Sequence, residues 1–327
     1  MKATVTVTVT VTVTVIRLFR VLLLAVLLGA LSACAPSPEP PPSAQSIVVH
    51  DALGREVRLP AEPKRVAALL GSFADVWALA GGEVCAAPAD AWEDFGLELH
   101  HAVNVGGAHS PSLELILSAS PDLVLASAST ASHVDMLDVL EAAGITVIFF
   151  EVDDFADYLA MLDTCTDLTG RKDLYERNGL SVMAQIEEIK AAYAAESLDE
   201  RERTVLLLRA SSGSVKAKGS RGTILGEMLA DLGCVNIADR DGTLLDQLSI
   251  EAVIRQDPRH IFVVAMGDHA AAEASLHRML AENPAWGTLI ALQEGRLHVM
   301  DKTLFNLKPN DRWGEAYRIL YETLVEN

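Results

Sequence analysis

One segment occurs twice in this chain, and the repetition limits the folds that are open to it. Residues 112–126 read SLELILSASPDLVLA, and residues 249–263 read SIEAVIRQDPRHIFV. Each copy predicts a serine N-cap, a short helix, a break at proline and a buried strand. The general grammar of αβ proteins can also produce such a unit, but the matched positions favour a duplication and hence two similar α/β halves. The identical positions are Ser112 and Ser249, Glu114 and Glu251, and Pro121 and Pro258.

The stretch between the two copies is helical. Apolar residues recur every three or four positions from Asp154 to Thr169, and Gly170 ends this helix. A second run, Arg171–Glu196, has the same spacing among good helix formers. At about 1.5 Å per residue it would extend roughly 39 Å, long enough to run from one half of the protein to the other.

Short strands alternate with helices on both sides of this divider, which predicts parallel α/β sheets. We expect a hairpin from Ile47–His50 and Glu56–Leu59, and a first buried strand at Arg65–Leu70 followed by a helix through Leu79. The second half is predicted to contain a strand at Arg203–Arg209, a loop at Ala210–Arg221, a helix at Thr223–Leu232, a strand at Leu297–Met300, a loop at Asp301–Pro309 and a last helix through Val325.

The N-terminus has the order of a secretion signal. Arg17 and Arg20 precede the apolar run Val21–Ala30, and Leu-Ser-Ala-Cys34 follows. A plain secretory signal or a membrane helix are the alternatives, but the apolar run is short for a span, and cysteine at this position favours lipidation. We therefore expect residues 1–33 to be a signal peptide and the proline-rich residues 34–46 to be a tether.

Charge and cysteine usage exclude some classes of protein. The formal charge of −19 argues against a nucleic-acid partner, although solubility alone also explains it. The cysteines form no Cys-x-x-Cys pair and no zinc-type cluster, so no metal site is predicted. Cys85 and Cys165 are expected to be core residues.

These features together resemble the solute-binding lipoproteins of ABC importers for iron chelates, haem and cobalamin, of the helical-backbone type. The resemblance covers nearly all of residues 47–327. It rests on DALGREV at 51–57 with PKRV at 63–66, on the two Ser-x-Glu units, and on Trp286 with GRLHV at 295–299.

The resemblance implies two Rossmann-like lobes joined by one long backbone helix, with a ligand cleft between the lobes. The implied domains are 47–170, the linking helix 171–197, and 198–327. It also implies that Glu114 and Glu251 pair with arginines of the permease, although both are also ordinary first-turn acids of a helix. The partners would be the permease with its ATPase and the membrane, through lipidated Cys34 on the extracytoplasmic face. We expect a monomer.

Candidate ligand residues lie on segments that follow strands, because strand ends face the crevice in such sheets. Aromatic faces and cations there suit a bulky anionic chelate. A core or lid position explains Trp92 and Phe305 equally well. Lys216 and Lys218 are ordinarily surface residues, but their clustering favours binding, and His109 is as well explained by local hydrogen bonding. The candidates are Ser72, Phe73, Trp92, His109, Arg209, Lys216, Lys218, Asp246, Phe305 and Lys308, with Ser127–Thr130 and Met266 beside them.

The favoured function is capture of a ferric siderophore or haem, with no cofactor of its own. A cobalamin carrier and a bare-metal carrier of the same fold are alternatives. A chelatase-like enzyme is a third, since similar paired lobes occur in metallochelatase and nitrogenase-like proteins. Against an enzyme, the sequence has no Gly-x-Gly-x-x-Gly, no P-loop, no nucleophile elbow and no cysteine cluster.

Overall fold

The computed structural model describes residues 47–60 and 62–325. The predicted signal peptide 1–33, the lipidation site Cys34 and the tether 34–46 lie outside the described residues. Among the helices of these described residues, none combines the length and the apolar composition of a membrane span.

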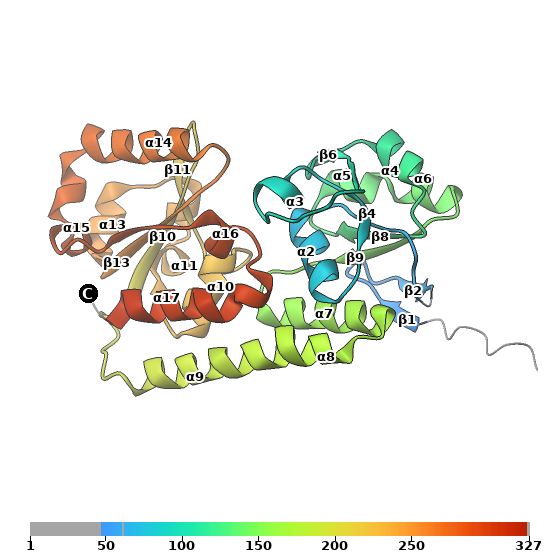
Figure 1. Ribbon diagram of the computed structural model, residues 1–327. Coiled ribbons are helices and arrows are strands. Elements are labelled where there is room, and N and C mark those ends of the chain that lie inside the picture. Colours follow the sequence, from blue (N-terminus) through green and yellow to red (C-terminus); the bar gives the residue numbers. More distant parts are fainter. Residues whose placement is uncertain (1–46, 61, 326–327) are drawn as a thin grey trace, which may run out of the picture. The chain divides into compact units, whose positions relative to one another are not determined.

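The first sheet is parallel throughout, with strand order β5-β4-β3-β8-β9 (Figure 1). Its first strand in the sequence, β3, lies at the centre, and Val66 there faces both Val84 and Leu123. Its strands are β3 Val66–Ala68, β4 Val84–Ala87, β5 Val103–Asn104, β8 Leu123–Ser127 and β9 Thr146–Phe150. Its helices are α2 Gly71–Leu79, α3 Asp90–Glu93, α4 Leu113–Ala119, α5 Ala131–Asp135 and α6 Leu137–Ala142, with a ribbon of β6 Gly106–Gly107 and β7 Ser110–Pro111.

The second sheet has the order β11-β10-β13-β14, and β12 also pairs with β10. Its strands are β10 Thr204–Ala210, β11 Val215–Lys218, β12 Val235–Asn236, β13 His260–Ala265 and β14 Leu297–Met300. Its remaining elements are α10 Ile224–Asp231, α11 Ile237–Arg240, α12 Thr243–Asp246, α13 Ile250–Gln256, α14 His269–Glu282, the 3-10 turn η2 Pro284–Thr288, α15 Ile290–Gln293, α16 Lys302–Phe305, the 3-10 turn η3 Asn310–Arg312 and α17 Trp313–Val325.

Two predicted loops were partly wrong. The segment 210–221 contains β11, an edge strand that runs antiparallel to β10. The alternation of Val215, Lys216, Ala217 and Lys218 buries Ala217 and exposes Lys216, which is the period of a strand. The segment 301–309 contains the short helix α16, whose N-cap Asp301 accepts hydrogen bonds from two backbone N–H groups.

The repeated unit has the same structure in both halves. Ser112 and Ser249 each cap the helix that follows, α4 and α13. Both helices end on a left-handed residue directly before the proline, Ser120 (φ 49°) and Asp257 (φ 42°). The next strand, β8 or β13, then pairs in parallel with the first strand of its half. The predicted equivalence therefore extends to the backbone.

The long helix is continuous but not uniform. It runs through α8 Lys172–Tyr175, a π-helical turn η1 Glu176–Leu180 and α9 Ser181–Ala195, while α7 Phe155–Thr169 ends at Gly170 (φ 69°) as predicted. A Cβ on Gly179 would lie 2.9 Å from Leu159 of α7, so glycine in the π turn allows the two helices to approach closely.

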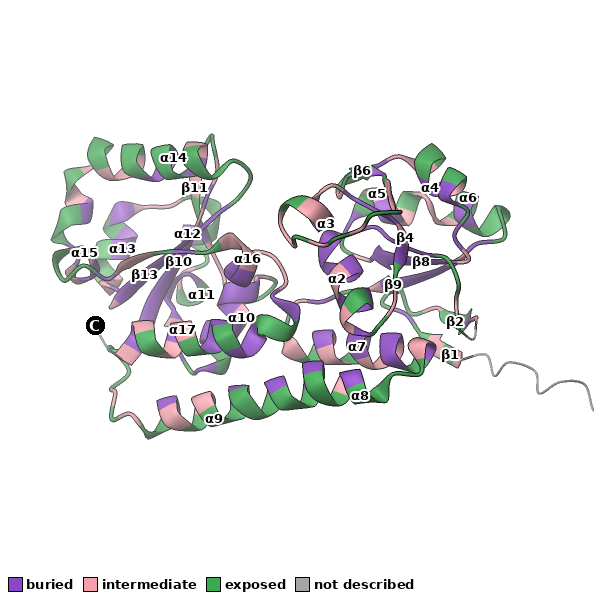
Figure 2. Cartoon of the chain, in the orientation of Figure 1, coloured by how far each residue is buried: buried purple, intermediate pink, exposed green. Residues whose placement is uncertain are grey.

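This helix packs against both halves of the protein. Asn178 donates a hydrogen bond to the Leu79 carbonyl of the first half at 2.8 Å. Toward its other end, Tyr193 is fully buried beneath the Arg203 guanidinium, and Lys190 pairs with Asp231 at 2.8 Å. The largest apolar core also contains residues of both halves and of this helix, whereas each sheet has a separate core on its other face. Figure 2 shows the buried strands and the one-sided burial of α9.

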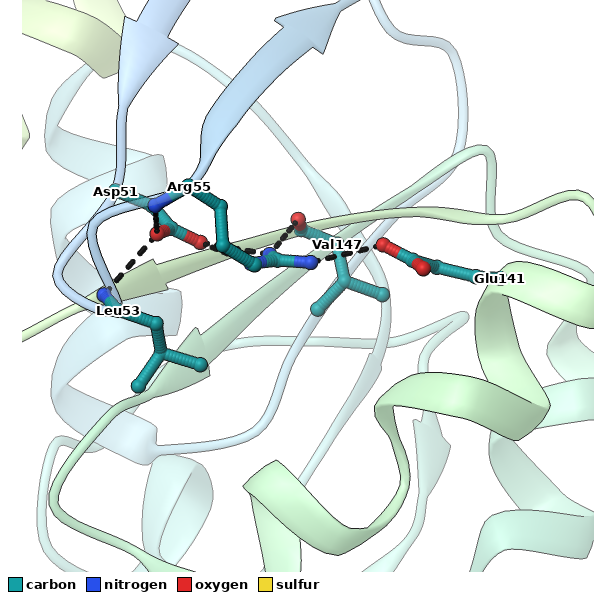
Figure 3. Close-up of polar contacts among 5 residues, drawn as sticks. All are labelled: Asp51, Leu53, Arg55, Glu141 and Val147. Carbon is teal, nitrogen blue, oxygen red and sulfur yellow. Dashed lines mark hydrogen bonds and ion pairs between the residues drawn. The ribbon is translucent and has the colours of Figure 1, made fainter.

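The hairpin of β1 Ile47–His50 and β2 Glu56–Leu59 has the predicted bounds. Its turn is fastened to the first sheet by Arg55, whose guanidinium bonds to Asp51, to Glu141 of α6 and to the Val147 carbonyl of β9 (Figure 3). The Asp51 carboxylate is fully buried and also accepts from the Leu53 and Arg55 backbone N–H groups. The DALGREV motif is therefore a structural clamp.

Candidate functional site

Three cations lie on one face of the β10–β11 ribbon. Arg209 is the cross-strand partner of Lys216, and Leu207 is the partner of Lys218. Since side chains alternate between the two faces of a strand, Arg209, Lys216 and Lys218 project from the same face. None of them belongs to an ion pair of the described chain. We call these three residues the basic face.

Two of the three cations of the basic face are disfavoured by burial. Arg209 is partly buried, its Nε has no hydrogen-bond partner, and burial lowers the pKa of its guanidinium. The pKa of Lys218 is also lowered, first by burial and then by the charges of Arg209 and Lys216. An anion placed here would relieve both effects, because it would supply the missing acceptor and the missing charge.

A cavity of about 910 Å³ adjoins the basic face and is lined by Arg209 and Lys218. The loop from Gly219 to Thr223 forms one wall, and α10 and α11 form others. Asp239 accepts from the Ser220 backbone N–H at 3.0 Å, and Asn236 donates to the Lys218 carbonyl at 2.7 Å, so the loop is held in place. This volume lies in the range of small-molecule sites in proteins.

The residues proposed from the first half are not equally accessible. Ser72 and Phe73 are buried in the first turn of α2, and the Phe73 ring packs edge-on against Phe150 at 6.1 Å. Trp92 in α3 is partly buried against the same core, whereas His109 is exposed between β6 and β7. Trp92 and His109 therefore keep surface that a ligand can contact.

The first half also contains a histidine that sequence reasoning missed. His133 of α5 is fully buried, and its Nδ1 accepts from the Ser127 backbone N–H at 3.2 Å. Its Nε2 therefore carries the proton and donates to the Ala108 carbonyl at 2.7 Å. Burial is also the main cause that lowers its pKa. The neutral ring ties together the segments that follow β8 and β6, and a lone histidine in the sequence gives no signal of this role.

The segment after β14 reaches across to the first half. Lys308 donates to the Val152 carbonyl at 2.5 Å, and Lys302 pairs with Asp94 at 2.5 Å. The Lys308 ammonium therefore already has a structural partner, and burial lowers its pKa. Phe305 is only 2% exposed and belongs to the core.

Asn310, which is fully buried, also connects the segment after β14 to the first half. Its side-chain amide donates to the Ser72 carbonyl at 3.0 Å and to the Asp75 carboxylate at 2.7 Å. Burial raises the pKa of Asp75 to about 6, against the lowering effect of the Asn310 hydrogen bond. The segment from Asp301 to Arg312 is thus a tie between the halves.

Glu114 and Glu251 occupy equivalent positions in α4 and α13, and both are exposed. Neither belongs to an ion pair within the described residues. The pKa of Glu251 is lowered by its backbone hydrogen bond and by the Ser249 hydroxyl, which donates to it at 2.9 Å.

Two other residues singled out in the sequence lie at the surface of the second half. Asp246 is exposed at the end of α12, and Met266 is 49% exposed after β13.

The described residues contain no group of three or more His, Cys, Asp or Glu side chains placed to hold a metal ion.

The profile of the periplasmic binding protein family matches residues 66–304. The chain belongs to this family.

Two relatives of this periplasmic binding protein come from Bacillus subtilis. An ABC transporter substrate-binding lipoprotein, YvrC, is 24% identical over 79% of each chain. The Fe(3+)-citrate-binding protein YfmC is 25% identical over 88% of this chain and 89% of its own. Among solved structures, Staphylococcus aureus SirA complexed with staphyloferrin B superposes with a TM-score of 0.67 at 20% identity, covering 85% of this chain and 98% of SirA. The last comparison shows a shared two-lobe fold.

Proposed function

We propose that this periplasmic binding protein is the solute-binding lipoprotein of an ABC importer, and that it captures an anionic ferric chelate for delivery to the permease and its ATPase. Binding without catalytic turnover is expected, since the family and the relatives described above are solute-binding proteins. Lipidated Cys34 would hold the protein on the extracytoplasmic face of the membrane.

The observation that carries the proposal is the basic face. In a chain with a formal charge of −19, three cations share one side of a ribbon, and none has an acidic partner among the described residues. Self-repulsion and burial both disfavour this arrangement unless an anion binds there. The adjoining cavity of about 910 Å³ has room for a chelate.

The comparisons support the same ligand class. One relative is named for binding Fe(3+)-citrate, and the structure of SirA contains staphyloferrin B. Citrate is a polycarboxylate, and carboxylates are the groups that guanidinium and ammonium ions bind best.

The proposed ligand residues are Arg209, Lys216 and Lys218, with Trp92 and His109 as contacts from the first half. Phe73 and Phe305 are left out because their rings have almost no exposed surface. Lys308 is assigned to the tie between the halves, because its ammonium already bonds to the Val152 carbonyl.

Tryptophan fluorescence tests the ligand class. The protein with Cys34→Ser would be titrated with ferric citrate, a ferric siderophore, haem and cobalamin. Saturable quenching by an anionic ferric chelate, weakened by rising salt, is the expected result. Saturation by cobalamin alone, or by none of the four, would contradict the proposal.

The docking proposal concerns Glu114 and Glu251. Replacing both by alanine should abolish chelate uptake by cells while chelate binding by the purified protein is unchanged. The matched control replaces Glu188 and Glu322, which are exposed acids on α9 and α17. Normal uptake by the Glu114→Ala/Glu251→Ala protein would refute the docking role.

A further inference from the structure

Asn310 of η3 is buried against the first half of the protein, and only its donors are satisfied. Its side-chain Nδ2 uses both hydrogens, on the Ser72 carbonyl at 3.0 Å and on the Asp75 carboxylate at 2.7 Å. Its Oδ1 is buried too, yet no donor of the described residues reaches it. Because an unpaired buried amide oxygen is costly, the contact between α2 and η3 lacks one donor.

The Asp75 side chain can supply that donor. An ionised carboxylate only accepts hydrogen bonds, whereas a protonated carboxyl also has an O–H that donates. Protonated Asp75 can therefore accept from Nδ2 of Asn310 and donate to its Oδ1. The indole Nε1 of Trp313 is another buried donor without a partner in the described chain, but it keeps its proton at every pH. Of the two, only Asp75 can make the contact depend on pH.

The charged groups of η3 leave Asp75 easy to protonate. Burial is the main cause that raises the pKa of Asp75 to about 6, and Asp311 raises it as well. The Asn310 hydrogen bond and Arg312 act in the opposite direction. The guanidinium of Arg312 is held by Glu315, to which it donates at 2.7 Å and 3.0 Å.

The other elements that pack against α2 are α3, α7, β3 and β4. None of these four contains a lysine, arginine or histidine that would hold Asp75 in its ionised form. In α3, Asp90 accepts from the Gly71 backbone N–H at 3.0 Å, at the start of α2. In α7, burial mainly raises the pKa of Tyr158, and the charges of Asp311 and Asp75 add to this effect.

The sign of the pH effect follows from burial. If the halves separated, Asp75 would be hydrated and its pKa would return toward the ordinary value of 3.8. The closed contact therefore binds the proton more tightly than an opened state does. The resulting gain is complete below about pH 4 and is lost as pH rises through 6.

We propose that Asp75 and Asn310 form a proton-operated latch between the two halves, which closes when the Asp75 O–H donates to Oδ1 of Asn310. The proton comes from solvent, since Asp75 keeps some exposed surface. With the latch closed, residues 301–312 separate from α2 less readily. Resting on the proposed function, the latch regulates the chelate site, because a chelate held between the halves leaves more slowly at pH 5 than at pH 7.5.

Hydrogen exchange of residues 301–312, measured by mass spectrometry on the ligand-free protein, tests the latch. The unmodified protein and Asp75→Asn are compared at the same pH, which removes the intrinsic pH dependence of exchange. The asparagine amide donates to Asn310 at every pH, so at pH 7.5 Asp75→Asn should exchange about fivefold more slowly. At pH 5 the two proteins should exchange alike.

A double-mutant cycle separates the latch from simple relief of a buried charge. Asn310 has a φ of 53°, which glycine adopts without strain, so Asn310→Gly removes the amide but keeps the turn. In the Asn310→Gly background, Asp75→Asn should not slow exchange. Equal slowing in that background, or no difference between Asp75→Asn and the unmodified protein at pH 7.5, would overturn the proposal. Glu188→Gln removes an exposed acid of α9 and should exchange as the unmodified protein does.

The dissociation rate of ferric citrate tests the regulation. Its ratio between pH 7.5 and pH 5 should be about fivefold larger in the unmodified protein than in Asp75→Asn, a comparison that cancels the pH dependence of the chelate itself. Equal ratios in the two proteins would refute control of the chelate site by the latch. If no chelate bound, the proposed function would fail, while the exchange rates without ligand would still decide whether the latch exists.

Discussion

Replacing Arg209 by methionine should make the ligand-free protein more stable and the chelate complex weaker. Arg209 is partly buried, its Nε has no partner, and Lys216 and Lys218 lie on the same face. Methionine fills similar space without a charge, so the desolvation cost and the repulsion are both removed. The free energy of unfolding should rise by up to about 1 kcal/mol, a modest gain because part of the guanidinium remains hydrated.

Chelate affinity should change in the opposite direction. A hydrogen bond from a charged donor to a carboxylate contributes about 1.5–3 kcal/mol. Its loss corresponds to roughly a 10- to 150-fold increase in Kd. The assay combines thermal denaturation of the ligand-free protein with fluorescence titration of ferric citrate. In the presence of ligand the order of the melting temperatures should reverse, since binding stabilises the folded state by mass action.

Arg318→Met is the matched control, because Arg318 is exposed on α17. It removes the same charge from the chain and should change neither quantity appreciably. An Arg209→Met protein with unchanged affinity, or with lower stability without ligand, would refute the assignment of Arg209 to anion binding.

Three further predictions concern stability. The pKa of Asp75 is raised from 3.8 to about 6, so the folded protein binds this proton more tightly than the unfolded chain does. The free energy of unfolding, measured by urea denaturation, should therefore rise as pH falls from 6 toward 4. Asp75→Asn, which still accepts a hydrogen bond from Asn310, should remove this rise. The pKa of His260 is lowered from 6.5 to about 4, so its stability contribution has the opposite pH dependence. This contribution is fully present above pH 6.5, and up to about 3 kcal/mol is lost as pH falls toward 4. His260→Phe should remove the loss. Arg55→Ala should lower the free energy of unfolding by about 2–4 kcal/mol, because it removes three side-chain contacts and leaves the buried Asp51 carboxylate without its partner. Lys64→Ala removes an exposed ion pair and should leave stability unchanged. Equal losses in the two variants would contradict the clamp.

Local pattern predicted the elements whose signals lie within a few residues. The hairpin at 47–59, the break at Gly170 and the two Ser-x-Glu units all follow from caps, glycines and periodicity, and the structure confirms them. The strand β11 was missed, because the glycine- and serine-rich residues before it read as one long loop and its pairing partner is only known from the fold.

The placement of the candidate site residues depended on packing, which a single sequence does not reveal. Phe73 and Phe305 follow strands, as ligand residues do, yet their rings fill the core. Lys308 follows a strand too, but the crossing of its segment to Val152 gives it a structural partner. The basic face was only partly foreseen, because the predicted loop became a strand that brings Lys216 opposite Arg209.

Native mass spectrometry of the protein with Cys34→Ser tests most directly whether the protein binds an intact anionic ferric chelate. Mixed with ferric citrate or a ferric siderophore, the protein should gain the mass of one complete chelate, and it should gain nothing from Fe(III) or Zn(II) without chelator. A mass increase from the bare metal ion, or none from any chelate, would contradict the account.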